Sequence, residues 1–186
     1  MSAVPRWVWF VGGGTILVVV GVALRKFIGR ALGGGALVQG HITAVSPFGP
    51  RGDHYHQGVD LFAAEGTPVA AAALGTVEMI GPSGRGGGYK MTGYGEYVVL
   101  RHAGGLRTLY AHLSKYNVSR GDRVSQGQII GEVGRTAYGE CGIYFCTDPA
   151  HLHFEVMPNE GPINRNLVRS EPVAWLQEHG LRPAIV

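Results

Sequence analysis

The chain has 186 residues and a mass of 19.8 kDa, which leaves room for one ordinary domain with a short appendage and argues against a two-domain enzyme. Hydrophobic residues make up 45% and charged residues 16%, which excludes a disordered polyelectrolyte, and a net charge of +3 without a long basic run gives no reason to expect nucleic acid as a partner. The 31 glycines follow no collagen period and lie at turn-like positions, which favours an all-β domain of short strands.

The first element is the uncharged apolar segment Trp7–Leu24. As a helix it would be about 27 Å long, close to the roughly 30 Å of a bilayer core. Residues 1–24 are therefore predicted to form a transmembrane anchor. A cleaved signal peptide is the alternative, because Gly21-Val22-Ala23 is an acceptable small-x-small site. Residues 25–37, basic and then glycine-rich, are expected to form a linker.

The charges around this segment conflict with export of the domain. Arg6 alone precedes the segment, whereas Arg25, Lys26 and Arg30 follow it. The positive-inside rule would keep the C-terminal side in the cytoplasm, although large domains often translocate regardless of such charges.

The body of the chain, residues 38–180, is predicted to be one β-sheet domain followed by a tail at 181–186. Strand-length apolar runs separated by glycine-bearing turns occur at His41–Val45, Thr76–Ile80, Tyr97–Arg101, Arg107–Tyr110, Gln128–Val133 and His151–Val156. Glu171–His179, with Pro172 in its first turn, is the best helix candidate. Gly81–Gly95 is a surface loop by composition, expected to line the rim of any site.

The two cysteines, Cys141 and Cys146, are separated by four residues. A tight hairpin would bring them close enough for a disulfide, which is the preferred interpretation, and two free thiols are the alternative. A disulfide would indicate an oxidising compartment and thus export.

Histidine spacing indicates a metal site. His56 and Asp60 are four residues apart and His151 and His153 are two apart, so in strands each pair shares a face, while apolar residues such as Val59 occupy the other. A hydrolytic zinc site needs three ligands of this kind and an open position. From spacing alone, His56, Asp60 and one of the paired histidines are candidate ligands, and His112 is a candidate for acid-base work.

Four blocks occur in order along the domain: FGPR followed by HQGVD (48–51 and 56–60), YAHL (110–113), GDRV followed by GQIIG (121–124 and 127–131), and HLHFE (151–155). They resemble the blocks of the lysostaphin/LytM-type zinc metalloendopeptidases, which cut the peptide part of bacterial peptidoglycan. The resemblance covers His41 to about Leu176. It implies a mainly antiparallel, LytM-like fold of the duplicated hybrid type.

The resemblance also implies roles for particular residues. His56, Asp60 and His153 would bind one Zn²⁺ per chain, and His112 and His151 would flank the metal-bound water as general base or as donors to the oxyanion. Glu155 lies on the same face of the strand as His153; orienting a ligand imidazole is one hypothesis for it, and a solvated strand-end carboxylate is the alternative. His54 and His102 are expected to be surface histidines.

The expected function is hydrolysis of peptidoglycan cross-links or stem peptides by zinc-activated water. The main alternative is a catalytically weak wall-binding module that activates another hydrolase, because some relatives have lost ligands. The GDRV…GQIIG stretch also resembles biotinyl or lipoyl carriers, but no lysine lies at a suitable hairpin tip. Because peptidoglycan is extracytoplasmic, the domain is expected outside the membrane, on a single-pass anchor or exported if the segment is cleaved.

The sequence departs from the family pattern near the site. Glu96 stands where asparagine is common, Ala137 stands where glycine is usual after Thr136, and residues 138–150 form a longer connection than usual. None of these positions belongs to the expected ligand set, and the long connection is expected to influence peptide specificity.

Overall fold

A computed structural model of the protein describes residues 35–52, 54–82, 93–137, 149–157 and 171–180. Within them the fold is mainly antiparallel β-sheet with one short α-helix, as the sequence predicts. The strands are β1 (Ala44–Ser46), β2 (Gly49–Arg51), β3 (His54–His56), β4 (Val59–Phe62), β5 (Pro68–Ala70), β6 (Gly75–Pro82), β7 (Glu96–Arg101), β8 (Arg107–Tyr116), β9 (Arg123–Val124), β10 (Ile129–Val133) and β11 (His151–Met157). A 3₁₀ turn, η1 (Ala103–Gly105), joins β7 to β8, and the helix is α2 (Pro172–Glu178).

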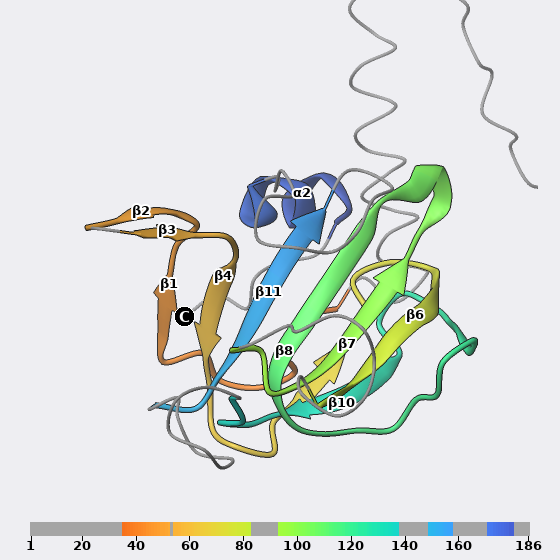
Figure 1. Ribbon diagram of the computed structural model, residues 1–186, viewed down its shortest axis with the longest axis horizontal. Coiled ribbons are helices and arrows are strands. Elements are labelled where there is room, and N and C mark those ends of the chain that lie inside the picture. The colour runs from red at the N-terminus through yellow and green to blue at the C-terminus, as the bar shows by residue number, and fades with distance from the viewer. Residues whose placement is uncertain (1–34, 53, 83–92, 138–148, 158–170, 181–186) are drawn as a thin grey trace, which may run out of the picture.

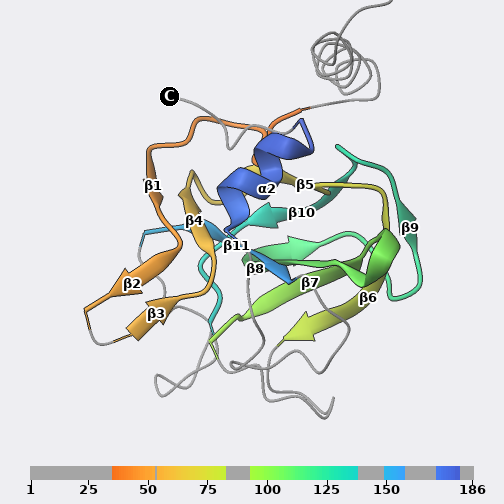
Figure 2. The ribbon, with the colours of Figure 1, turned by 90° about the horizontal axis from the view of Figure 1, so that it is seen from above.

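The main sheet follows the strand order β1-β4-β11-β8-β7-β6-β9 (Figure 1). β10 pairs with β8 and also with β5, while β2 and β3 form a separate hairpin that projects beside β1 and β4 (Figure 2). Because β11 is hydrogen-bonded to β4 on one side and to β8 on the other, three segments distant in sequence meet at the centre of the sheet.

The register of β11 aligns the histidine blocks. His153 pairs with Asp60 of β4 and with Ala111 of β8. His151, two residues earlier, pairs with Phe62. The pairing therefore brings the HQGVD, YAHL and HLHFE blocks side by side.

The face opposite the histidines forms the core. Val59, Leu61, Leu152 and Phe154 are fully buried there, which confirms the predicted alternation of apolar and polar residues. Tyr110 of β8 packs edge-to-face on Phe154, with ring centroids 5.3 Å apart. Burial of these large side chains stabilises the core face of β4, β8 and β11, so their polar residues lie on the opposite face.

The predicted strands are present with somewhat different ends, and the short strands β2, β5 and β9 were not predicted. β8 continues to Tyr116, six residues beyond the predicted strand end, and the strand predicted from His41 begins at Ala44. The helix is confirmed. Its N-cap, Glu171, accepts hydrogen bonds from the backbone N–H groups of Val173 and Ala174.

Leu37, at the end of the predicted linker, packs into the domain. This residue is fully buried, and its carbonyl accepts the N–H of Ala70 at 2.8 Å. The predicted anchor at 1–24 and both cysteines, Cys141 and Cys146, lie outside the described residues. Among the residues that the structure describes, no helix has the length and apolar character needed to cross a membrane.

His102 is not simply a surface histidine, contrary to the expectation from sequence. Its Nδ1 lies 2.9 Å from the carbonyl oxygen of Leu74, and its Nε2 lies 2.7 Å from the hydroxyl of Thr108. Burial lowers the pKa of His102, and the nearby His179 lowers it further. The side chain thus connects the start of β6 to β8 as a neutral hydrogen-bonding group.

Candidate metal centre

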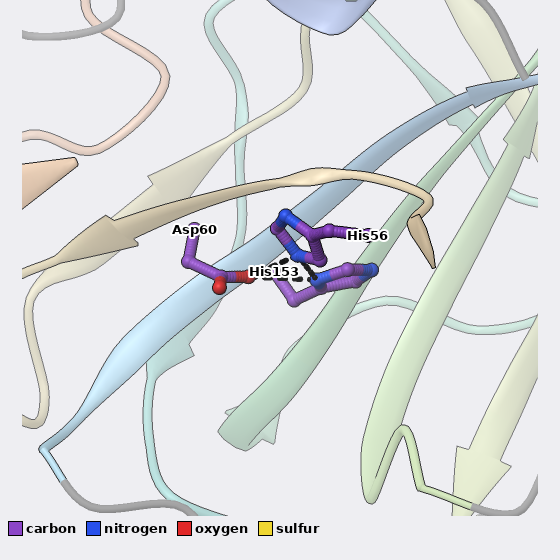
Figure 3. A group of neighbouring side chains, drawn as sticks. All are labelled: His56, Asp60 and His153. Carbon is purple, nitrogen blue, oxygen red and sulfur yellow. Dashed lines mark hydrogen bonds and ion pairs between the residues drawn. The ribbon is translucent and has the colours of Figure 1, made fainter. Parts of the chain in front are cut away.

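His56, Asp60 and His153 point toward one another from β3, β4 and β11 (Figure 3). Nε2 of His56 lies 3.0 Å from Oδ1 of Asp60 and 3.1 Å from Nδ1 of His153, and the last two atoms are 2.8 Å apart. All three side chains are buried. In the described part of the chain, they are the only three metal-binding side chains whose ligand atoms converge in this way.

The donor set and its spacing fit zinc. Imidazole nitrogen and carboxylate oxygen bind Zn²⁺ at about 2.0–2.2 Å, so neighbouring ligands of a tetrahedral site lie roughly 3.3–3.5 Å apart. The three separations of 2.8–3.1 Å are slightly shorter than these edges. Three ligands on one side also leave the fourth position for a water or a substrate.

Pro47 determines which nitrogen of His56 faces the centre. The Pro47 carbonyl lies 2.8 Å from Nδ1, and because a carbonyl only accepts, Nδ1 carries the hydrogen and Nε2 keeps its lone pair for a metal. The guanidinium of Arg51 lies 2.7 Å from the same Nδ1 and 2.8 Å from Oδ2 of Asp60. Since the guanidinium only donates, its compatible partner is the carboxylate.

His153 uses the opposite nitrogen. Its Nε2 lies 3.0 Å from Oε1 of the fully buried Glu155, so Nε2–H donates to this carboxylate and Nδ1 is left for the metal. The hypothesis that Glu155 orients a ligand imidazole is therefore supported by a direct contact, and its alternative, a solvated carboxylate, is wrong.

His56 and Asp60 meet for a different reason from the one predicted. They do not lie on one strand: His56 ends β3, which pairs with β2, and Asp60 is the second residue of β4. The bend between them passes through Gly58, whose missing side chain lets the backbone approach β11 closely. The pair therefore converges across a bend.

His112 is fixed beside the ligand group by two backbone contacts. Its Nδ1–H donates to the Thr136 carbonyl at 2.7 Å, and its backbone N–H donates to the Tyr94 carbonyl at 2.9 Å. Its φ of 60° is uncommon for a residue other than glycine. The residue lies in the middle of β8, and its ring centroid is 5.8 Å from that of His153.

His151 is fixed in the same tautomer. Its Nδ1–H donates to the Pro149 carbonyl at 2.9 Å, and its Nε2 lies 3.9 Å from Oδ1 of Asp60. The His151 and His112 ring centroids are 4.7 Å apart. The structure thus places all five predicted site residues together, three as a converging donor set and two as its neighbours.

The electrostatics separate these histidines into two kinds. Burial lowers the pKa of His112 to about 3, with nearby His153 and His151 contributing, and burial also lowers the pKa of His151. Both are therefore neutral near pH 7. For His153, burial lowers the pKa, but hydrogen bonds to Asp60 and Glu155 outweigh it and raise the value to about 9.

Asp60 is held in its charged form. Burial would raise its pKa, but contacts with His153, His56 and Arg51, together with the charge of His153, lower it well below the usual range. The proton held between His153 and Asp60 lies where a metal ion would bind, since both compete for the same lone pairs.

Residues 54–165 match the family model described as Peptidase family M23. The chain belongs to peptidase family M23. This confirms the family predicted from the four sequence blocks, and together with the His/Asp/His donor set it confirms zinc as the cofactor.

Similar proteins are found in several bacteria. The DD-carboxypeptidase/endopeptidase Mpg of Neisseria meningitidis is 40% identical over 125 residues, 64% of this chain and 25% of that protein. The peptidoglycan DD-endopeptidase ShyC of Vibrio cholerae is 37% identical over 121 residues, 61% of this chain and 24% of that protein. The chain thus spans about a quarter of the length of these curated relatives.

A solved structure of the catalytic domain of the antimicrobial peptidase lysostaphin from Staphylococcus simulans superposes with a TM-score of 0.58. The two chains are 34% identical, and the alignment covers 72% of this chain and 92% of that domain. The similarity therefore spans nearly all of that catalytic domain.

Sequence reasoning missed the groups that set the histidine tautomers. Three of them are backbone carbonyls, of Pro47, Thr136 and Pro149. A carbonyl is present at every residue, so no side-chain pattern could have indicated them. Tyr94 was predicted only as part of a surface loop at the rim of the site, without the hydrogen bonds that its backbone and side chain make there.

Gly58→Ala tests the close packing behind the ligand group. A Cβ at this position would lie 2.5 Å from the Phe154 carbonyl oxygen and 2.7 Å from Cε1 of His153. The Phe154 backbone is held by strand pairing with both β4 and β8, so it cannot easily give way. We therefore expect the His153 ring to move instead. Zinc affinity, measured by chelator competition, should fall at least about tenfold. A stability loss with unchanged affinity would instead show that the strain is absorbed away from His153.

Proposed function

We propose that this protein is a zinc-dependent endopeptidase that hydrolyses peptide bonds of bacterial peptidoglycan, in cross-links or stem peptides. The observation that carries the proposal is the converging donor group with two further histidines fixed beside it in one tautomer. The names of the relatives support the substrate class, since ShyC is a peptidoglycan DD-endopeptidase and Mpg a DD-carboxypeptidase/endopeptidase.

In this proposal His56, Asp60 and His153 hold the zinc ion through Nε2, a carboxylate oxygen and Nδ1. When bound, zinc supplies a Lewis acid that polarises the scissile carbonyl and lowers the pKa of a water molecule. Arg51 donates to Oδ2 of Asp60 and so holds the carboxylate with its other oxygen toward the two histidines.

His112 and His151 carry the proton transfers. Each donates its Nδ1–H to a backbone carbonyl, so the Nε2 of the neutral ring has a lone pair and no hydrogen. Either ring can therefore accept a proton from the attacking water at Nε2. Once protonated, the ring donates a hydrogen bond from Nε2 to the developing oxyanion and then transfers that same proton to the departing amine nitrogen.

The lowered pKa values fit this order of events. Both rings begin neutral near pH 7 because burial disfavours their charged forms. An imidazolium formed in such surroundings gives up its proton readily, which favours delivery to the amine nitrogen.

Substitution of His151 and of His153 should have different effects. The full chain, purified with zinc, is incubated with isolated sacculi, and the released fragments are identified by mass spectrometry. We expect His151→Ala to lower fragment release about 10²- to 10⁴-fold with zinc content nearly unchanged. His153→Ala should lose the metal as well, because one of the three ligands is gone.

The exposed His41→Ala is the matched control, since His41 lies outside the site and should tolerate the change. Sacculi with diaminopimelate-type and with glycine-bridged walls identify the bond from the new peptide ends. No fragments from either wall, with zinc bound and the domain folded, would contradict the endopeptidase and favour a wall-binding module.

We further propose that residues 1–24 anchor the chain in the cytoplasmic membrane with the domain on the extracytoplasmic side. The uncharged stretch Trp7–Leu24 and the peptidoglycan substrate support this arrangement. In that oxidising compartment, Cys141 and Cys146 are expected to form a disulfide.

The anchor is tested by Leu17→Lys in a bacterial host. A lysine at the centre of a span costs about 2.5–3.5 kcal/mol. We therefore expect an alkaline wash to release the Leu17→Lys variant from the membrane fraction into the soluble fraction, whereas the unchanged chain should stay with the membrane. In cells with the unchanged chain, protease added to spheroplasts should degrade the domain. Protection of the domain would place it in the cytoplasm, as the charges of Arg25, Lys26 and Arg30 suggest.

A further inference from the structure

We infer that Tyr94 is a positioning residue of the metal centre, acting on His153 through Glu155 and on His112 through its own backbone. The inference rests on the proposed zinc site and extends it to a residue outside the four sequence blocks. Tyr94 lies two residues before the start of β7 and is half-buried. It contacts the small apolar cluster formed by Tyr97, Val99, Leu109, Ala111 and Met157.

The side chain of Tyr94 acts on Glu155. Its hydroxyl donates to Oε1 of Glu155 at 2.6 Å, and the same oxygen accepts Nε2–H of His153 at 3.0 Å. Glu155 is fully buried, so the position of this oxygen is determined by its protein contacts. The Tyr94 ring also lies beside the His153 imidazole, with centroids 5.7 Å apart. The hydroxyl therefore helps fix the group that orients a metal ligand.

The backbone of Tyr94 acts on His112. The Tyr94 carbonyl accepts the His112 backbone N–H at 2.9 Å. Two residues later, the N–H of Glu96 donates to the Thr136 hydroxyl at 2.8 Å, and the Thr136 carbonyl accepts Nδ1–H of His112. The segment Tyr94–Glu96 thus holds His112 both directly and through Thr136.

Gly95 allows this segment to lie so close. It has a positive φ of 61°, and a Cβ there would overlap the backbone carbonyl of Thr136. The short path from Tyr94 to Glu96 therefore connects a ligand histidine on β11 with a proton-transfer histidine on β8.

A purely structural role for Tyr94 predicts a different result from a positioning role. If Tyr94 only packs, removing its hydroxyl lowers the stability of the metal-free protein and leaves the intrinsic affinity for zinc unchanged. If it positions Glu155, removing the hydroxyl loosens the carboxylate and shifts its oxygen relative to Nε2 of His153. Loss of such outer partners typically lowers metal affinity about 10- to 100-fold.

The test compares Tyr94→Phe with Tyr97→Phe in the full chain. Tyr97 is a buried tyrosine of the same apolar cluster, so it matches the chemical change without touching Glu155 in any described contact. Zinc affinity is measured by chelator competition, and the visible absorption of the Co²⁺-loaded protein reports ligand geometry. We expect about tenfold weaker zinc binding and a shifted Co²⁺ spectrum for Tyr94→Phe, and less than about a twofold change for Tyr97→Phe.

Glu155→Gln keeps the experiment decisive if Tyr94→Phe folds poorly. Glutamine keeps an oxygen that can accept both hydrogen bonds, but it carries no charge, so these bonds become weaker than the charge-assisted bonds to the carboxylate. Glu155→Gln should therefore weaken zinc binding. The double variant Tyr94→Phe/Glu155→Gln should bind zinc only slightly less tightly than the weaker-binding of the two single variants, because both substitutions act on the same connected contact.

Additive losses, or zinc affinity and a Co²⁺ spectrum unchanged in Tyr94→Phe, would overturn the inference. Sacculus digestion by the unchanged protein separates this result from the proposed function. If the unchanged protein releases no fragments but Tyr94→Phe still weakens zinc, the endopeptidase fails and the positioning role stands. If the unchanged protein cleaves and Tyr94→Phe binds zinc normally, only the positioning role fails.

Discussion

The antiparallel pairing of β11 with both β4 and β8 is the constraint on which the rest of the site depends. It places His153 opposite Asp60 on one side and Ala111 on the other, and it brings His112, the next residue of β8, to the same region. The buried side chains of Leu61, Leu152 and Phe154 hold this register from the core face. A slip by one residue would turn every histidine of β11 into the core, so the apolar packing and the metal centre specify the same register.

Backbone carbonyls then determine what each histidine can do. Nδ1–H groups of His56, His112 and His151 all donate to carbonyls, which leaves each Nε2 with a lone pair. His153 is the exception, because the Glu155 carboxylate takes its Nε2–H and leaves Nδ1 for the metal. Ligation and proton transfer therefore need little side-chain rearrangement, and pre-organisation of this kind is what an efficient hydrolytic site requires.

The sequence predicted those parts of the site that follow from local periodicity. The alternation of His151, Leu152, His153 and Phe154 correctly indicated a strand with a polar and an apolar face, and the four blocks indicated the family. The same reasoning gave a wrong account of His56 and Asp60, because it assumed one strand where a bend separates two. A residue spacing of four is compatible with both arrangements.

The contacts that remained hidden connect residues distant in the chain. Tyr94 and Glu155 are 61 positions apart, and His112 and Thr136 are 24 apart. Such pairs depend on how the strands are ordered in the sheet, which local patterns do not specify. Composition predicted a loop at the rim of the site for Gly81–Gly95, but it did not indicate the two hydrogen bonds that Tyr94, near the end of that segment, makes there.

A crystal structure of the zinc-loaded protein, with anomalous difference density recorded at the zinc edge, tests the central claim most directly. The account predicts one strong peak bonded to Nε2 of His56, a carboxylate oxygen of Asp60 and Nδ1 of His153. His112 and His151 should still donate to their backbone carbonyls. A peak bound to Nε2 of His153, or one that recruits His112 or His151 in place of Asp60, would contradict the assignment of ligands and tautomers.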